Sequence, residues 1–233
     1  MLSILLHRFN SEDEYDVYNC NSVILEQIIE VLGADNYVDP KDFAGSKNCE
    51  GWFITVDDGN STDLELARFL SSRAMRAVFF INPGLIGGVN YASIEELRLI
   101  ETLGHYIANH SFSHLNLIKL NNTEIFDQIR LAKEWIQKNG FNQLNYFAYP
   151  WGRNNFAIRR QVKNMGYEVA FGVTARKFDD CSPRGVLPRL AVTSSFDIAQ
   201  LHRVLAMRNF GHAESWFREI FRILQTCKSK LDI

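Results

Sequence analysis

Short apolar runs alternate with longer amphipathic stretches along most of the chain. Runs rich in β-branched and aromatic residues are typical of buried strands, whereas apolar residues spaced three and four apart predict helices. We therefore predict strands at 3–7, 52–56, 76–82, 105–109, 145–149, 167–173 and 186–192. Helices are predicted at 23–33, 61–75, 93–104, 122–140 and 155–166, followed by a helical C-terminal tail from about Ser194.

Repeated strand–helix units favour an α/β fold with a mainly parallel sheet, and seven such strands can close into a barrel. No repeat, low-complexity tract or Pro/Gly-rich linker divides the sequence, so we expect residues 1–233 to form a single domain. Active sites of such folds gather at the carboxyl ends of the strands. Four polar clusters follow predicted strands, and we expect them to meet at one rim: LLH, TVDDG, ANHSFSH and YPWG.

The charge balance argues against a nucleic-acid-binding protein. The formal net charge is -2, and 22% of the residues are charged without forming a long run of one sign. A basic footprint for nucleic acid is therefore absent.

Three features of the sequence bear on where the protein is located in the cell. The first residues, MLSILLHRFN, lack the charged start and the run of about 7–15 apolar residues typical of a secretory signal. No stretch approaches the roughly 20 apolar residues of a membrane span. The four cysteines, Cys20, Cys49, Cys181 and Cys227, are far apart and are interpreted as free thiols. These features together predict a cytoplasmic protein without a transmembrane segment.

Two histidines and two aspartates have the residue types and spacing of a metal site. His110 and His114 are four residues apart in HSFSH, a spacing at which two imidazoles can reach one cation. Either Asp57 or Asp58 fits as an oxygen ligand, and the other carboxylate would then accept a proton from the attacking water. A nearby cation would also offset the repulsion between the two adjacent carboxylates.

Each of these motifs has a plain structural interpretation as well. A D-D-G alone is usually a turn with a solvated or capping aspartate, and an isolated H-x-x-x-H is often a surface or core pair. The absence of H-E-x-x-H argues against a zincin-type protease. His105 begins a strand, on the side opposite the rim, and we expect it to be structural.

Four segments, in this order, resemble the polysaccharide deacetylase family, also called the NodB-homology domain. They are ITVDDGN, ARFLSSRAMRAVFFIN, LGHYIANHSFSHLNL and YFAYPWG, and the resemblance extends from about Ile54 to Gly172. It implies a distorted seven-stranded (β/α) barrel. It also implies metal-dependent hydrolysis of an N-acyl group, usually an N-acetyl on an amino sugar.

The resemblance also implies a role for each matching residue. Asp57 takes the position of the general base, and Asp58, His110 and His114 take those of the metal ligands, with Zn²⁺ as the expected ion. In the third motif, Tyr149, Pro150 and Trp151 fall at substrate-binding positions. There Trp151 supplies a backbone N–H to the oxyanion and its ring lines the sugar groove, although core packing is an equal alternative for the ring.

The sequence departs from the family pattern at two points. Ala148 stands where the family has an arginine that orients the base, and Arg189 in LPRLAV is a candidate replacement. An ordinary surface arginine is the competing interpretation. The family's general-acid histidine, usually in a late Leu-x-His motif, is matched better by His7 in SILLHRF than by His202 in AQLHRVL. That placement resembles the circularly permuted deacetylases.

The substrate expected from the resemblance is an N-acylated amino sugar in a glycan or a glycan precursor. Deformylation, or hydrolysis of a non-sugar amide, would use the same residues. An inactive carbohydrate-binding module that retains the fold is the alternative from another class, favoured by the loss of the motif arginine. The sequence does not determine the oligomeric state.

Overall fold

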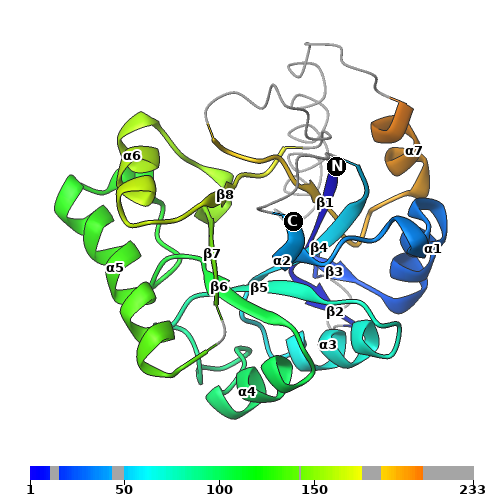
Figure 1. Cartoon of the computed structure of the whole chain (residues 1–233), viewed down its shortest axis with the longest axis horizontal. Coiled ribbons are helices and arrows are strands. Elements are labelled where there is room, and N and C mark those ends of the chain that lie inside the picture. The colour runs from blue at the N-terminus through cyan, green and yellow to red at the C-terminus, as the bar shows by residue number, and fades with distance from the viewer. Residues whose placement is uncertain (11–15, 44–49, 142, 175–184, 207–233) are drawn as a thin grey trace, which may run out of the picture.

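The computed structural model describes residues 1–10, 16–43, 50–141, 143–174 and 185–206. Figure 1 shows a curled central sheet with helices around its outside. The sheet has seven strands, all of whose pairings are parallel. Their order is β8 (Val169–Phe171), β7 (Gln143–Ala148), β6 (Tyr106–Asn109), β5 (Ala77–Ile81), β4 (Trp52–Asp58), β1 (Leu2–Leu6) and β9 (Leu190–Ala191). The predicted α/β class and distorted seven-stranded barrel are confirmed.

The segment leading into β9 contacts two strands that are far apart in the order of the sheet, β8 and β1. Leu187 forms a parallel bridge with Phe171 of β8, and three residues later Leu190 pairs with Ile4 of β1. Between them, Pro188 has no N–H to offer a neighbouring strand. The predicted strand at 186–192 is therefore reduced to two residues, and the segment changes partner from β8 to β1.

Most helices begin and end as their sequences predict. Asn21 caps the start of α1, and Ser93 with Glu96 forms the predicted capping box of α4. The helix predicted at 61–75 is shorter than expected, because the backbone turns at Ala74, whose φ is 55°. The helices are α1 (Ser22–Leu32), α2 (Pro40–Phe43), α3 (Asp63–Ser71), α4 (Ile94–Thr102), α5 (Asn122–Lys138), α6 (Phe156–Asn164) and α7 (Ile198–Ala206), with 3-10 turns η1 (Ala34–Asn36), η2 (Leu117–Lys119) and η3 (Pro150–Gly152).

The two faces of the sheet carry different side chains. Along β4, Trp52, Ile54 and Val56 belong to a large apolar cluster that also contains residues of α1, α3 and α4. Phe53 belongs to a second cluster formed largely by strand residues. Because alternate residues of a strand share a face, Asp57 lies on the same inner face as Phe53. The side chain of Asp57, the general base expected from the sequence, is therefore on the inner face of the barrel.

The first strand of the chain lies inside the sheet, next to its edge strand β9. β1 pairs with β4 along its whole length and with β9 on its other side. Immediately after it, β2 (Arg8–Phe9) pairs in parallel with β3 (Asn19–Cys20) in a small separate sheet. The end of β1 is thereby placed next to the end of β4.

Several predictions about the chain as a whole are tested only in part. Within the described ranges, no helix is both long and apolar enough to cross a membrane. Cys20 is a buried free thiol, whereas the other three cysteines lie outside the described residues. The C-terminal tail begins as a turn at Ser194 and becomes helical at Ile198, and residues 207–233 lie outside the described part.

Candidate active site

Asp57 and Asp58 end strand β4 in two different environments. Asp57 is 2% exposed, and its carboxylate lies within the barrel. Asp58 adopts a φ of 85°, and Gly59 follows with a φ of 73°. Non-glycine residues rarely adopt this left-handed backbone, which is enriched at functional sites. This turn carries the second carboxylate to the rim, away from the first.

Arg189 forms a two-pronged ion pair with Asp57. Its two terminal nitrogens each lie 2.7 Å from a carboxylate oxygen, and its Nε donates to the carbonyl of Gly172. Both side chains of the pair are almost completely buried. Burial alone would raise the pKa of Asp57, but the charge of Arg189, with a smaller contribution from His110, lowers it to about 2. Asp57 is therefore held as an oriented carboxylate.

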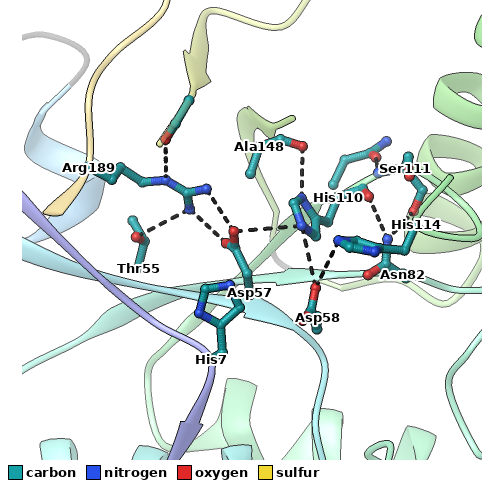
Figure 2. A network of polar contacts seen from close by, with 12 residues as sticks. His7, Thr55, Asp57, Asp58, Asn82, His110, Ser111, His114, Ala148 and Arg189 are labelled. Carbon is teal, nitrogen blue, oxygen red and sulfur yellow. Dashed lines mark hydrogen bonds and ion pairs between the residues drawn. The ribbon is translucent and has the colours of Figure 1, made fainter. Parts of the chain in front are cut away.

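Three side chains converge on one point at the rim (Figure 2). Oδ1 of Asp58 lies 3.5 Å from Nε2 of His110 and 3.3 Å from Nε2 of His114. One potential ligand atom from each residue lies within 4.8 Å of the others. This Oδ1 is buried and accepts no hydrogen bond. A buried carboxylate oxygen without a donor, facing two imidazole nitrogens, has the chemistry of a cation site.

The ring of His110 is fixed in the orientation that a ligand needs. Its Nδ1 lies 2.8 Å from the carbonyl oxygen of Ala148, and since a carbonyl only accepts, the proton is on Nδ1. The lone pair of Nε2 then points toward Asp58. Burial, followed by the proximity of His110, lowers the pKa of His114, which favours the neutral form of His114. Both imidazoles are thus prepared to bind a metal.

Two asparagines hold the loop that carries these histidines. The side-chain amide of Asn82, at the end of β5, donates to the carbonyls of His110 and Ser111. Oδ1 of Asn109 accepts from the N–H of Ser111 at 2.7 Å. Ser111 and His114 both have positive φ, at 68° and 53°. The asparagines therefore stabilise a backbone that the HSFSH sequence would not favour by itself.

His7 lies on the other side of Asp57 (Figure 2). It follows β1 directly, and its backbone carbonyl accepts from the side chain of Asn60, which also donates to the carbonyl of Asp57. Asn60 thus ties the ends of β1 and β4 together. Nδ1 of His7 is buried and has no hydrogen-bond partner. Burial lowers the pKa of His7, and the charges of Asp58 and Asp57 oppose that shift.

A sequence model of polysaccharide deacetylases matches residues 44–170, more than half of the 233 residues. The chain belongs to the polysaccharide deacetylase family. The match contains the Asp57–Asp58 pair, both loop histidines and the segment that ends at Gly152. It does not extend to His7 or Arg189, which the sheet order brings to the same rim.

Two curated relatives illustrate the similarity within the polysaccharide deacetylase family. Chitin deacetylase 1 of Saccharomyces cerevisiae is 34% identical over 115 residues, which are 49% of this chain and 36% of that protein. A bifunctional xylanase/xylan deacetylase of Cellvibrio japonicus is 28% identical over 124 residues, 52% of this chain and 18% of that protein. The matched region thus spans less than half the length of either relative.

Solved structures of deacetylases share the fold over most of the chain. Streptococcus pyogenes deacetylase PplD, solved with acetate, superimposes with a TM-score of 0.77 at 14% identity, covering 88% of this chain and 97% of that one. IcaB from Ammonifex degensii gives a TM-score of 0.72 at 18% identity, covering 88% and 95%. Each superposition covers 88% of the chain and therefore extends beyond the region matched by the family sequence, residues 44–170.

Two aromatic residues of the third family motif, Trp151 and Tyr149, differ in how far they are exposed at the site. The ring of Trp151 lies 4.9 Å from that of His114, and 58% of the residue is exposed. Its φ of 59° turns the backbone sharply after Pro150, which is buried. Tyr149 is 1% exposed, and its ring packs against Phe147 in the core. Tyr149 is therefore left with its backbone, and not its ring, for any contact with a substrate.

The structure separates the two candidates for the general acid. His202 is exposed on α7, which packs against α1 in the outer layer of helices. His7, in contrast, lies among the catalytic candidates. His105 lies at the opposite end of β6 from His110, as expected for a structural residue.

Sequence reasoning missed some residues that support the site. Oγ1 of Thr55 donates to the carbonyl of Ile4 and lies 3.4 Å from a nitrogen of Arg189, so it connects β4 to β1 and to the segment that carries Arg189. Its alternation with Asp57 in TVDDG was the available signal. The role of Asn109 had no such signal, because its partners lie on α5 and before β8.

Proposed function

We propose that the chain is a metal-dependent hydrolase that removes an N-acetyl or other N-acyl group from an amino sugar in a glycan or glycan precursor. Membership of the polysaccharide deacetylase family supports deacetylation of glycans. One further observation carries the proposal. A carboxylate held by Arg189 lies directly beside a cluster of two imidazoles and a second carboxylate. This is the arrangement needed for base-assisted attack of water next to a cation.

Asp58, His110 and His114 would hold the metal, and Zn²⁺ is the expected ion because two imidazoles and one carboxylate are a common catalytic zinc set. When bound, such an ion supplies Lewis acidity to the attacking water and to the amide carbonyl. The ion pair with Arg189 keeps Asp57 ionised and directed into the site, 3.6 Å from Nε2 of His110.

The proton transfers are assigned to two residues on opposite sides of the amide. Asp57 accepts a proton from the attacking water, and the oxygen of that water bonds to the carbonyl carbon. The C–N bond then breaks, and His7 gives a proton to the departing nitrogen, which leaves as the free amine of the sugar together with the carboxylate of the acyl group. Asp57 lies on β4 and His7 directly follows β1, the parallel neighbour of β4, and these positions support the division.

Substrate contacts are assigned to the third motif. The backbone N–H of Trp151 stabilises the developing oxyanion, as the family resemblance implies, and its exposed ring lines the groove. Pro150 fixes the turn, and Tyr149 contributes only through its backbone, because its ring is in the core.

The observed partner of Asp57 weakens the argument for an inactive binding module. The sequence lacks the motif arginine at Ala148, but the guanidinium of Arg189 contacts both carboxylate oxygens of Asp57. A module that only bound sugar would gain nothing from a buried, charge-paired carboxylate next to a metal site.

The test is acetate release from N-acetylglucosamine oligomers by the zinc-loaded protein, with metal content measured in parallel. Asp57→Asn should reduce turnover by about 10²- to 10⁴-fold, the usual contribution of a general base, and should keep the metal. Asp42→Asn is a matched control, because Asp42 lies on α2 and is exposed. No acetate release by the wild type with any of several amino sugars would contradict the proposal.

A further inference from the structure

An exposed aromatic side chain lies against His7 and is not part of any family motif. The ring of Tyr18 is 4.9 Å from the ring of His7, inclined at 46°, and 41% of the residue is exposed. Exposed tyrosines are common on protein surfaces. Tyr18 differs from such residues because its backbone is hydrogen-bonded to Arg8, the residue after His7.

A buried carboxylate holds the backbone of Tyr18 in place. Oδ1 of Asp16 accepts from the N–H of Tyr18 at 2.9 Å, and Oδ2 accepts from the guanidinium of Arg8 at 2.9 Å. The N–H of Arg8 donates to the carbonyl of Tyr18. Asp16 is 6% exposed. The small sheet of β2 and β3 continues this connection, so Tyr18 and His7 share one rigid support.

The same arrangement occurs at the metal side of the site. There the ring of Trp151 lies 4.9 Å from the ring of His114 and is also largely exposed. His7 and His114 thus each have a partly exposed aromatic ring packed against the imidazole. The two rings belong to segments more than a hundred residues apart in sequence.

We propose that Tyr18 forms the wall on which the sugar ring of the substrate stacks, opposite the side where Trp151 lies. This inference rests on the proposed function. His7 gives its proton to the amide nitrogen, which is bonded directly to the sugar, so the sugar ring lies at the His7 end of the site. A pyranose has an apolar C–H face, and an aromatic ring with few rotatable bonds is a suitable surface for it.

The experiment measures the Kd of chitopentaose by calorimetry, with the zinc-loaded Asp57→Asn variant as the background so that turnover is slow during the titration. Tyr18→Leu should weaken binding about three- to ten-fold, the range expected for loss of one aromatic contact. Tyr18→Phe keeps the ring and should restore the Kd to within about two-fold. Phe126→Leu is the matched control, because Phe126 is similarly exposed but lies on α5.

A Kd of Tyr18→Leu equal to that of the background would overturn the proposal, and so would equal weakening by Phe126→Leu. In the active protein, a fall in kcat with an unchanged Kd would show that Tyr18 only orients His7, which also contradicts the stacking role. Unfolding curves of the variants verify that each one is folded.

The result is separable from that of the proposed function. If the wild type releases no acetate, the hydrolase assignment fails, and the same Kd measurements are then made in the wild-type background. Weaker binding in Tyr18→Leu alone would still support a sugar-stacking wall, whereas equal binding would reject it.

Discussion

Two buried histidines at opposite ends of β6 show how this protein separates support from chemistry. His105 and His110 are each 1% exposed. Nδ1 of His105 accepts from the N–H of Ala77, and its Nε2 lies 2.9 Å from the carbonyl of Ala67. Both of its nitrogens are therefore used by the protein. His110 uses only Nδ1 in this way, and its Nε2 faces carboxylate oxygens at 3.5 and 3.6 Å, beyond ordinary hydrogen-bond length.

Burial alone thus does not distinguish a structural imidazole from a functional one. What differs is whether the protein itself satisfies the second nitrogen. At the amino end of the strand it does, and the ring joins α3 to β5. At the carboxyl end it does not, which leaves a ligand position directed at Asp58.

The largest expected effect comes from exchanging each histidine for alanine. His110→Ala should reduce bound zinc from about one ion per chain toward zero, since three protein ligands are the usual minimum for a catalytic zinc site. His105→Ala should keep the zinc and lose stability instead, because it removes hydrogen bonds to two buried backbone groups. Metal analysis together with urea unfolding separates the two effects. Zinc retained by His110→Ala would contradict the assignment of His110 as a metal ligand and of His105 as a structural residue.

Arg189 gives the next effect, on stability. Arg189→Met leaves the buried carboxylate of Asp57 without its partner, so the free energy of unfolding should fall by about 3–5 kcal/mol. The double variant with Asp57→Asn should recover part of this loss, because no buried charge then remains. If Arg189→Met alone is too unstable to purify, the double variant and Asp57→Asn still provide the comparison. A fall of less than about 1 kcal/mol in the free energy of unfolding of Arg189→Met would contradict the stabilising role of the pair.

The pH dependence of stability provides the smallest and most specific test. Burial lowers the pKa of His105 from 6.5 to about 4, so the unfolded chain binds a proton more readily than the folded one between these values. The stabilising contribution is complete above pH 6.5 and is lost as the pH falls toward 4. The full loss is about 3 kcal/mol.

His105→Gln removes that titration. Its free energy of unfolding, measured at intervals from pH 7 to pH 4.5, should fall less steeply than that of the wild type. Parallel curves for the two proteins would indicate that His105 titrates normally in the folded state.

The sequence predicted one half of the site much better than the other. Asp57, Asp58, His110 and His114 each directly follow or end a clearly patterned strand, so local alternation and the family motifs identify them. His7 and Arg189 come from opposite ends of the barrel sequence, and their position depends on β1 lying between β4 and β9. Local patterns do not encode that order.

Two features near strand ends show the same limit of local patterns. Pro188 shortens β9, and its segment pairs first with β8 and then with β1, which hydrophobicity alone does not reveal. Tyr149 was assigned to the substrate because the motif places it there, but its ring belongs to an apolar cluster with Ile158 of α6. A side chain just past a strand can turn toward the helix layer, where packing determines its direction.

The central claim is that Asp58, His110 and His114 bind a single divalent cation and leave Asp57 free. Anomalous scattering at the zinc absorption edge, from crystals grown with zinc, tests it most directly. The account predicts one peak at roughly 2.0–2.2 Å from a carboxylate oxygen of Asp58 and from Nε2 of both histidines. A zinc peak bound through Asp57 in place of Asp58, or no peak between the two imidazoles, would contradict it.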